Sequence, residues 1–199
     1  MITACEKNKI RGERLKYNIE MQGATRTSVI FKDSRYLDNF FSFDKILLDA
    51  PCSVSGTLNA SNKSIESFTL ELINRSVKAQ TELIIKAIKI LKVGGELVYS
   101  TCSILKEENE EIVNKILENK NLEIVTINKE QFNELPLLPC NINDALLIKP
   151  TKLYEGFFVI KIKKLKWVIF YNSFLYYYNV KILLHFYYMY WNIKVFMLN

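Results

Sequence analysis

Cysteine and histidine are scarce in this chain of 199 residues, which has four cysteines and one histidine, His185. The cysteines lie far apart, at Cys5, Cys52, Cys102 and Cys140, and no two of them form a C-x-x-C pair. Zinc sites use four ligands of these types at short spacings, so the sequence does not favour a metal site. It does not favour a disulfide scaffold either, because a chain of this length can bury a core without one.

A secretory signal is also not recognised, since the start, MITACEKNKIRGERLK, runs straight into charged residues. We therefore expect an intracellular protein with free thiols. The formal net charge is +6, but residues 165–199 hold three lysines and no acid. Without that segment, 24 basic residues stand against 21 acidic ones. A balance of +3 permits nucleic-acid binding without arguing for it.

Residues 165–199 lack glycine, proline and acidic residues, yet they carry 13 of the 25 aromatic residues. Lys166, Lys181 and Lys194 divide the segment into apolar runs shorter than the roughly 20 residues of a membrane span, so we expect no membrane segment. Neither a helical nor an alternating period is clean. We interpret the segment as a tail of doubtful origin, either a translated non-coding extension or an ill-defined apolar appendage.

Short apolar segments alternate with helical segments in the rest of the chain. This alternation predicts an α/β fold with a doubly wound, mostly parallel sheet. A glycine pair at Gly94 and Gly95 is predicted to end the longest helix. The expected strands are 1–6, 27–33, 43–52, 96–102, 121–128 and 155–164, and the expected helices are 8–23, 64–95 and 107–119.

Acidic and thiol side chains stand where the predicted strands end, at Glu6, Asp33, Asp49 with Cys52, and Cys102. Parallel sheets bind ligands at the carboxyl ends of their strands, so these groups are expected to line one edge. Glu6 could hold the two hydroxyls of a ribose, or could be a solvated strand end. Asp33 could accept a hydrogen bond from an adenine amino group, or could cap the turn at Ser34.

The stretch DAPCS at 49–53 is more specific. Pro51 cannot continue a central strand, so the chain must turn out of the sheet beside Asp49 and Cys52. A single buried cysteine is more often a small apolar residue than a nucleophile. Two thiols at matching strand ends, beside an aspartate, favour a reactive site over this simpler reading. A reactive thiol needs partial exposure and a lowered pKa, and a turn from a strand to a helix can supply both. The run EENEE at 107–111 is interpreted as a helix start without chemistry.

Four features together resemble the catalytic domain of the RNA cytosine-5 methyltransferases of the NOL1/NOP2/Sun (Fmu-like) family. They are DAPCS at 49–53, GGELVYSTCSILKEENEEIV at 94–113, EGFFVIKIKK at 155–164, and the spacing of Glu6, Arg11, Leu15, Asn18 and Gly23. Two other methyltransferase families fit less well. DNA cytosine methyltransferases use one cysteine after a proline, and amino-methyltransferases use a turn without a thiol, so neither pattern matches the two thiols of this chain. The resemblance implies a partial, Rossmann-like methyltransferase domain at 1–164 that depends on S-adenosylmethionine.

By this resemblance, Cys102 is the nucleophile that adds to carbon 6 of a cytosine in ribosomal or transfer RNA. Asp49 binds the polar edge of that cytosine and lies beside the cofactor, and Cys52 assists loss of the carbon-5 proton and release of the adduct. Glu6 would hold the cofactor ribose and Asp33 its adenine. The base must leave its stack, so single-stranded or loop RNA is the expected substrate. The family implies residence in the nucleus, nucleolus or cytoplasm.

The chain also departs from the family pattern. The family has an earlier strand followed by a glycine-rich loop, whereas this chain begins inside the second strand. We expect the missing strand to leave a cleft with unpaired backbone groups, and we expect weak cofactor binding. After DAPCS the chain reads VSGTLNASNKS, which differs from the family and predicts a weaker RNA-contacting loop. The alternative function is a catalytically inactive RNA-binding or scaffold fragment.

Overall fold

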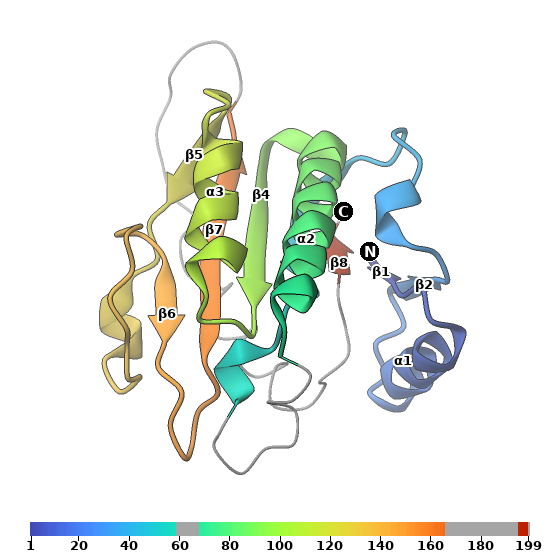
Figure 1. Ribbon diagram of the computed structural model, residues 1–199. Coiled ribbons are helices and arrows are strands. Elements are labelled where there is room, and N and C mark those ends of the chain that lie inside the picture. Colours follow the sequence, from blue (N-terminus) through green and yellow to red (C-terminus); the bar gives the residue numbers. More distant parts are fainter. Residues whose placement is uncertain (59–67, 166–194, 199) are drawn as a thin grey trace.

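The computed structural model describes residues 1–58, 68–165 and 195–198. Its sheet has the strand order β2-β1-β8-β3-β4-β7-β5, and β6 pairs with β7 (Figure 1). The helices are α1 (Lys9–Met21), α2 (Leu70–Ile90) and α3 (Glu110–Leu117). The strands are β1 (Ile2–Cys5), β2 (Thr27–Ile30), β3 (Phe43–Asp49), β4 (Leu91–Thr101), β5 (Leu122–Val125), β6 (Leu146–Ile148), β7 (Phe157–Lys164) and β8 (Val195–Leu198).

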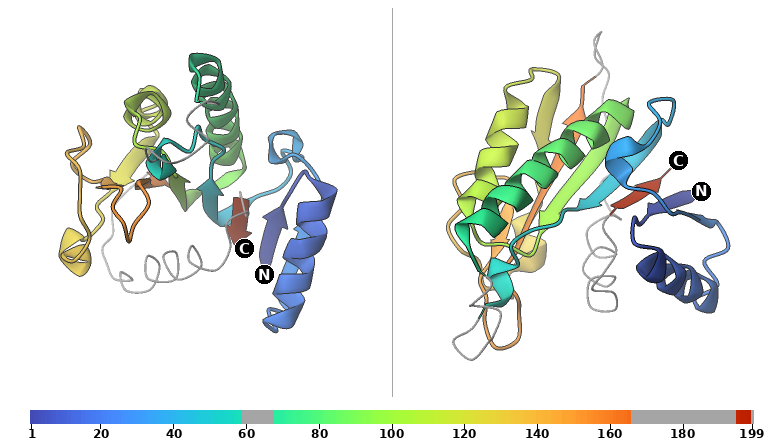
Figure 2. Two further views of the ribbon diagram at one scale, coloured as in Figure 1. Left: turned by 60° about the horizontal axis from the view of Figure 1, so that its bottom comes forward. Right: turned by 45° about the vertical axis from the view of Figure 1, so that its right-hand side comes forward.

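Strands β1 to β6 run in one direction, and β7 and β8 run against them. The crossover from β1 leads outward to β2, whereas the crossover from β3 leads the other way to β4. Because both crossovers are right-handed, their helices fall on opposite faces of the sheet. Figure 2 shows α2 and α3 over one face and α1 on the other side, beside β1 and β2. The predicted doubly wound, mostly parallel α/β fold is confirmed.

Helix α2 packs on the sheet through an apolar stripe. Leu83, Ile84, Ala87 and Ile90 are buried and recur at spacings of three and four residues, as an amphipathic helix requires. Together with Ile112 and Ile116 of α3 they belong to the main core cluster. Within the described ranges, no helix combines the length and the apolar character that crossing a membrane would take.

The predicted end of the long helix was wrong. Helix α2 stops at Ile90, and β4 begins at the next residue. Gly94 has φ +81° and lies where the register between β3 and β4 shifts, with Phe43 opposite Leu91 but Lys45 opposite Glu96. Glycine adopts this left-handed conformation without strain, so Gly94 permits the irregularity of β4 at this point and does not end a helix. Residues 64–67 of the predicted helix lie outside the described residues.

The expected open cleft in the sheet was also wrong, because β8 fills it. This strand pairs antiparallel with β1 on one side and with β3 on the other. Backbone groups of β1 and β3 that would otherwise lack partners are thereby paired. Neither β8 nor the short β6 was predicted from the sequence. The rest of the aromatic tail, 166–194 and Asn199, lies outside the described residues.

Candidate active site

The carboxyl ends of β3 and β4 bring the two predicted thiols together. Asp49 and Ser100 face each other in the register of these strands, so the turns that follow start side by side. The Sγ atoms of Cys52 and Cys102 lie 2.9 Å apart, and both residues are half-buried. The Ser100 hydroxyl donates to Asp49 Oδ1 at 3.3 Å. Asp49, Cys52 and Cys102 therefore form one cluster.

The pKa of the Cys102 thiol is raised well above its ordinary value. The largest cause is the hydrogen bond with Cys52, followed by burial and by the electrostatic effect of the neighbouring Cys52 and Asp49 side chains. Since the thiolate is the nucleophilic form, the proton held between the two sulfurs must leave before Cys102 can attack.

The turn that carries Cys52 is constrained by its backbone. Val54 adopts a left-handed conformation with φ +63°, which is uncommon for a β-branched residue. The Gly56 amide donates to the Cys102 carbonyl at 3.1 Å, and the Gly156 amide donates to the Gly56 carbonyl at 2.8 Å. A methyl group on Gly56 would collide with the Gly156 backbone. These contacts lock the two cysteine turns against each other and against the segment that precedes β7.

A buried glutamate holds the residue that follows Cys52. Glu108, the last residue of the 3-10 turn η4 (Lys106–Glu108), is 0% exposed. One oxygen of its carboxylate accepts from the Ser53 amide at 2.7 Å, and the other accepts from the Ser53 hydroxyl at 2.6 Å. The Gln80 amide group is 3.5 Å from the first oxygen.

The next residue, Asn109, holds both neighbours of Cys102. Its Oδ1 accepts from the Thr101 hydroxyl at 2.6 Å, and its Nδ2 donates to the Ser103 carbonyl at 2.9 Å. Asn109 and Glu108 were missed by the sequence analysis, which treated EENEE only as a helix start. One signal could have found Glu108: it stands four residues before Ile112, on the face that Ile112 and Ile116 continue into the core.

The two predicted cofactor acids line a separate pocket, to which Pro51 of the Cys52 turn also belongs. Glu6 follows β1 and is 3% exposed. Its Oε1 accepts from the Asn8 amide at 2.7 Å and from Arg11 Nη2 at 2.8 Å. Its Oε2 is buried without a hydrogen-bond partner. A buried, unpaired carboxylate oxygen is costly, so this atom suits a hydroxyl donor from a ligand.

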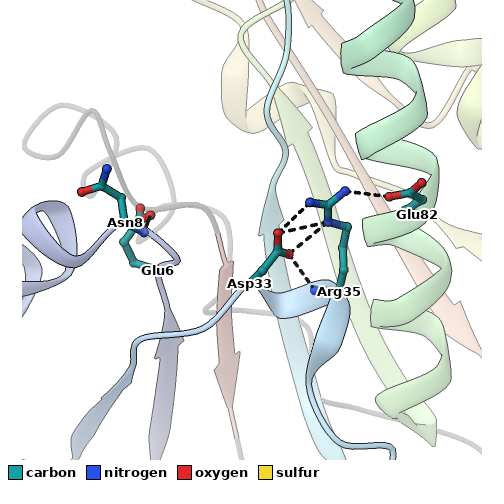
Figure 3. Close-up of polar contacts among 5 residues, drawn as sticks. All are labelled: Glu6, Asn8, Asp33, Arg35 and Glu82. Carbon is teal, nitrogen blue, oxygen red and sulfur yellow. Dashed lines mark hydrogen bonds and ion pairs between the residues drawn. The ribbon is translucent and has the colours of Figure 1, made fainter.

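The other acid, Asp33, is already engaged by Arg35 (Figure 3). Arg35 Nε lies 3.0 Å from Asp33 Oδ1, Nη2 lies 2.7 Å from Oδ2, and Nη1 reaches Glu82 at 2.7 Å. The hydrogen bond from Arg35 is the largest cause that lowers the pKa of Asp33. Arg35 therefore competes with any ligand for Asp33, and sequence reasoning gave no hint of this.

The pocket between these acids is small. Its volume is about 60 Å³, well below the roughly 300–1,000 Å³ of typical ligand pockets. The residues fit the hydroxyl end of a nucleoside through Glu6, whereas the adenine end needs Arg35 to move. In the described part of the chain, no group of three or more His, Cys, Asp or Glu side chains could hold a metal ion.

A family model described as 16S rRNA methyltransferase RsmB/F matches residues 1–163. The chain belongs to this family. The predicted resemblance to RNA cytosine-5 methyltransferases is confirmed by this match. Membership covers β1 to β7, and with them both cysteine turns and both pocket acids.

Curated and solved relatives agree with the family match. The Ribosomal RNA small subunit methyltransferase F of Shewanella piezotolerans is 32% identical over 168 residues, covering 82% of this chain and 35% of that protein. A tRNA (cytosine(72)-C(5))-methyltransferase of Pyrococcus horikoshii is 35% identical over 167 residues, covering 83% and 41%. The crystal structure of NSun6 from Pyrococcus horikoshii with SFG superposes with a TM-score of 0.71 at 33% identity, covering 82% and 41%. The chain thus spans about two fifths or less of the length of these relatives.

Proposed function

We propose that residues 1–164 act as the catalytic domain of an RNA cytosine-5 methyltransferase. The observation that carries the proposal is the pair of thiols 2.9 Å apart at the carboxyl ends of β3 and β4, beside Asp49. Membership of a methyltransferase family supports it. The relatives' names also support it, because the Pyrococcus horikoshii protein's name specifies carbon 5 of cytosine in transfer RNA and the Shewanella piezotolerans protein's name specifies ribosomal RNA.

In this proposal the Cys102 thiolate forms a bond to carbon 6 of the cytosine, which makes carbon 5 nucleophilic. Asp49 binds the polar edge of the base and orients it. S-adenosylmethionine, when bound, supplies the methyl group that carbon 5 takes up. The Cys52 thiolate then accepts the carbon-5 proton, and the electron pair of that C–H bond re-forms the ring double bond. The bond from carbon 6 to sulfur breaks, and Cys102 leaves as a thiolate.

The pocket acids would hold the cofactor on the β1–β2 side. Glu6 would accept from the ribose hydroxyls through its unpaired Oε2. Asp33 would accept from the adenine amino group once Arg35 has shifted away from it. The RNA substrate would be single-stranded or a loop, because the cytosine has to leave its stack to reach the thiols.

Two observations favour a second candidate, a catalytically inactive RNA-binding or scaffold fragment. The pocket is small, and Asp33 is paired with Arg35. A chain that never opened this pocket would keep the fold without the chemistry. The two candidates differ in covalent chemistry, since an inactive fragment forms no bond between a thiol and RNA.

Incubation with S-adenosylmethionine and a cytosine-containing RNA, followed by a denaturing gel, separates these candidates. We expect Cys52→Ala to accumulate a covalent RNA adduct and Cys102→Ala to form none, with Cys140→Ala as the matched thiol control that behaves like the unmodified chain. Equal trapping by both variants would overturn the assigned roles. RNA binding without any adduct or methyl transfer would favour the scaffold function.

A further inference from the structure

The turns that carry Cys52 and Cys102 lie 50 residues apart in sequence, yet one short segment holds both of them. Glu108 holds Ser53, the residue after Cys52, through two hydrogen bonds of 2.6 and 2.7 Å. Asn109, its direct neighbour, holds the residues on either side of Cys102. Both side chains are 0% exposed. The positions of both thiols are thus fixed by two consecutive residues of the chain.

We propose that Glu108 and Asn109 are the positioning residues of the two-thiol site. Glu108 sets the position of Cys52, and Asn109 sets the position of Cys102. This inference deepens the proposed function and rests on it where catalysis is concerned. The separation of the two thiols, however, is a property of the chain that can be measured without any activity.

The segment is itself firmly anchored, as a positioning element has to be. The Tyr99 hydroxyl donates to the Glu108 carbonyl at 2.7 Å from a fully buried ring. Helix α3 follows at once and buries Ile112, Val113 and Ile116 in the core. The 3-10 turn therefore cannot shift without disturbing both the sheet and the helix.

The chemistry of the contacts makes them specific for an acid followed by an amide. Ser53 presents two donors side by side, and a carboxylate offers two acceptors at matching spacing. Asn109 accepts from a hydroxyl and donates to a carbonyl, which an aspartate cannot do. A second pair, the hydroxyls of Ser55 and Ser103 at 2.8 Å, ties the same turns together farther along.

Cross-linking with diamide tests the positioning directly in the 199-residue chain. Diamide takes up the two protons and two electrons of the thiols, is reduced to the hydrazine, and leaves a Cys52–Cys102 disulfide that peptide mapping detects. We expect Glu108→Ala to slow this reaction about tenfold or more, the scale of lost hydrogen bonds to a charged group. Glu108→Gln should recover part of the rate, because its amide oxygen still accepts and the Ser53 hydroxyl can turn to accept.

Two controls separate positioning from general loss of stability. Glu107→Gln changes an exposed acid of the same turn and should leave the rate unchanged. Ile116→Ala removes core contacts of α3 and should lower the melting temperature without slowing the cross-link in the folded protein. If Ile116→Ala slows the cross-link as much as Glu108→Ala at an equal loss of melting temperature, or if Glu108→Ala cross-links at the normal rate, the inference is wrong.

The adduct assay supplies a second readout that a merely structural role would not produce. Glu108→Gln should act like a weak Cys52→Ala and slow release of the adduct, whereas Asn109→Asp should act like a weak Cys102→Ala and slow its formation. Equal losses in both steps for both variants would contradict the division of roles. An unmodified chain that cross-links normally but transfers no methyl group to RNA, and whose Cys52→Ala variant forms no adduct, would overturn the proposed function and leave the positioning supported.

Discussion

The two halves of the sheet are held together in different ways. In the cysteine half, β3 pairs directly with β4 and β4 with β7, and hydrogen bonds to Glu108 and Asn109 fix the turns at its carboxyl edge. The acid half, β1 with β2, is joined to the rest of the sheet, among the described strands, only through β8. Its Glu6 leaves a buried oxygen unpaired. The edge that carries the thiols is therefore preorganised, whereas the edge that carries the acids keeps a hydrogen-bond acceptor that a ligand could use.

Removing β8 should have the largest effect, and it should fall on the acid half of the sheet. A chain that ends at Lys194 leaves the facing edges of β1 and β3 unpaired, at about 1–3 kcal/mol for each backbone group that stays buried. Hydrogen exchange measured by mass spectrometry should show lost protection in Ile2–Cys5 and retained protection in Leu97–Ser100. A chain that lacks only Asn199 is the control. Unchanged protection of β1 would show that β8 does not hold the acid half.

Two glycine substitutions, one in each half, should differ in their effect on stability. Gly56→Ala pushes a methyl group against the Gly156 backbone and should lower the free energy of unfolding by about 3 kcal/mol. Gly12→Ala in α1 meets the side chain of Phe31, which is 44% exposed, so that the ring has solvent on one side into which it can shift. Since alanine favours the helix, the net change there should stay within about 1 kcal/mol. Urea unfolding gives both values, and equal losses would contradict the difference in rigidity.

The thiol pair makes a prediction about pH. Because the hydrogen bond between the Cys102 thiol and Cys52 is the largest cause that raises the pKa of Cys102, Cys52→Ala should lower that pKa toward its ordinary value. Alkylation of Cys102 by iodoacetamide should then begin at a lower pH than in the unmodified chain. Cys5, whose pKa burial raises to about 11, is an internal reference that should not change. A Cys102 profile that stays in place would mean that the two thiols do not share a proton.

The smallest expected effect concerns Arg35. The pKa of Asp33 is lowered mainly by its hydrogen bond with Arg35, so Arg35→Met should raise it toward the ordinary value. A lowered folded-state pKa stabilises the fold above the unfolded-state value of about 3.9. That contribution is lost as the pH falls through the folded-state value. The stability gap between the two chains should be at most about 1 kcal/mol at neutral pH and should close in acid. A gap that is independent of pH would assign the effect to packing.

The sequence predicted the sheet, its strand-end residues and the family, because strand–helix alternation and the DAPC and TC turns are local patterns. The predictions from the sequence failed where contacts between residues far apart in the chain determine the structure. Nothing local in 165–199 indicates that Val195–Leu198 pairs with β1 and β3. Gly94 looked like a helix end because a left-handed glycine serves helix ends and strand irregularities alike. Glu108 and Asn109 looked like helix-start residues without chemistry, since the role of a buried acid depends on donors from residues distant in the sequence.

The most direct test of the central assignment is to identify which thiol carries the RNA. An RNA with 5-fluorocytosine cannot lose a proton from carbon 5, so the unmodified chain with S-adenosylmethionine should stop at the covalent stage. Protease digestion and mass spectrometry of the trapped complex should place the nucleotide on the peptide that contains Cys102. A nucleotide on Cys52, or no adduct at all, would contradict the assignment of Cys102 as the nucleophile.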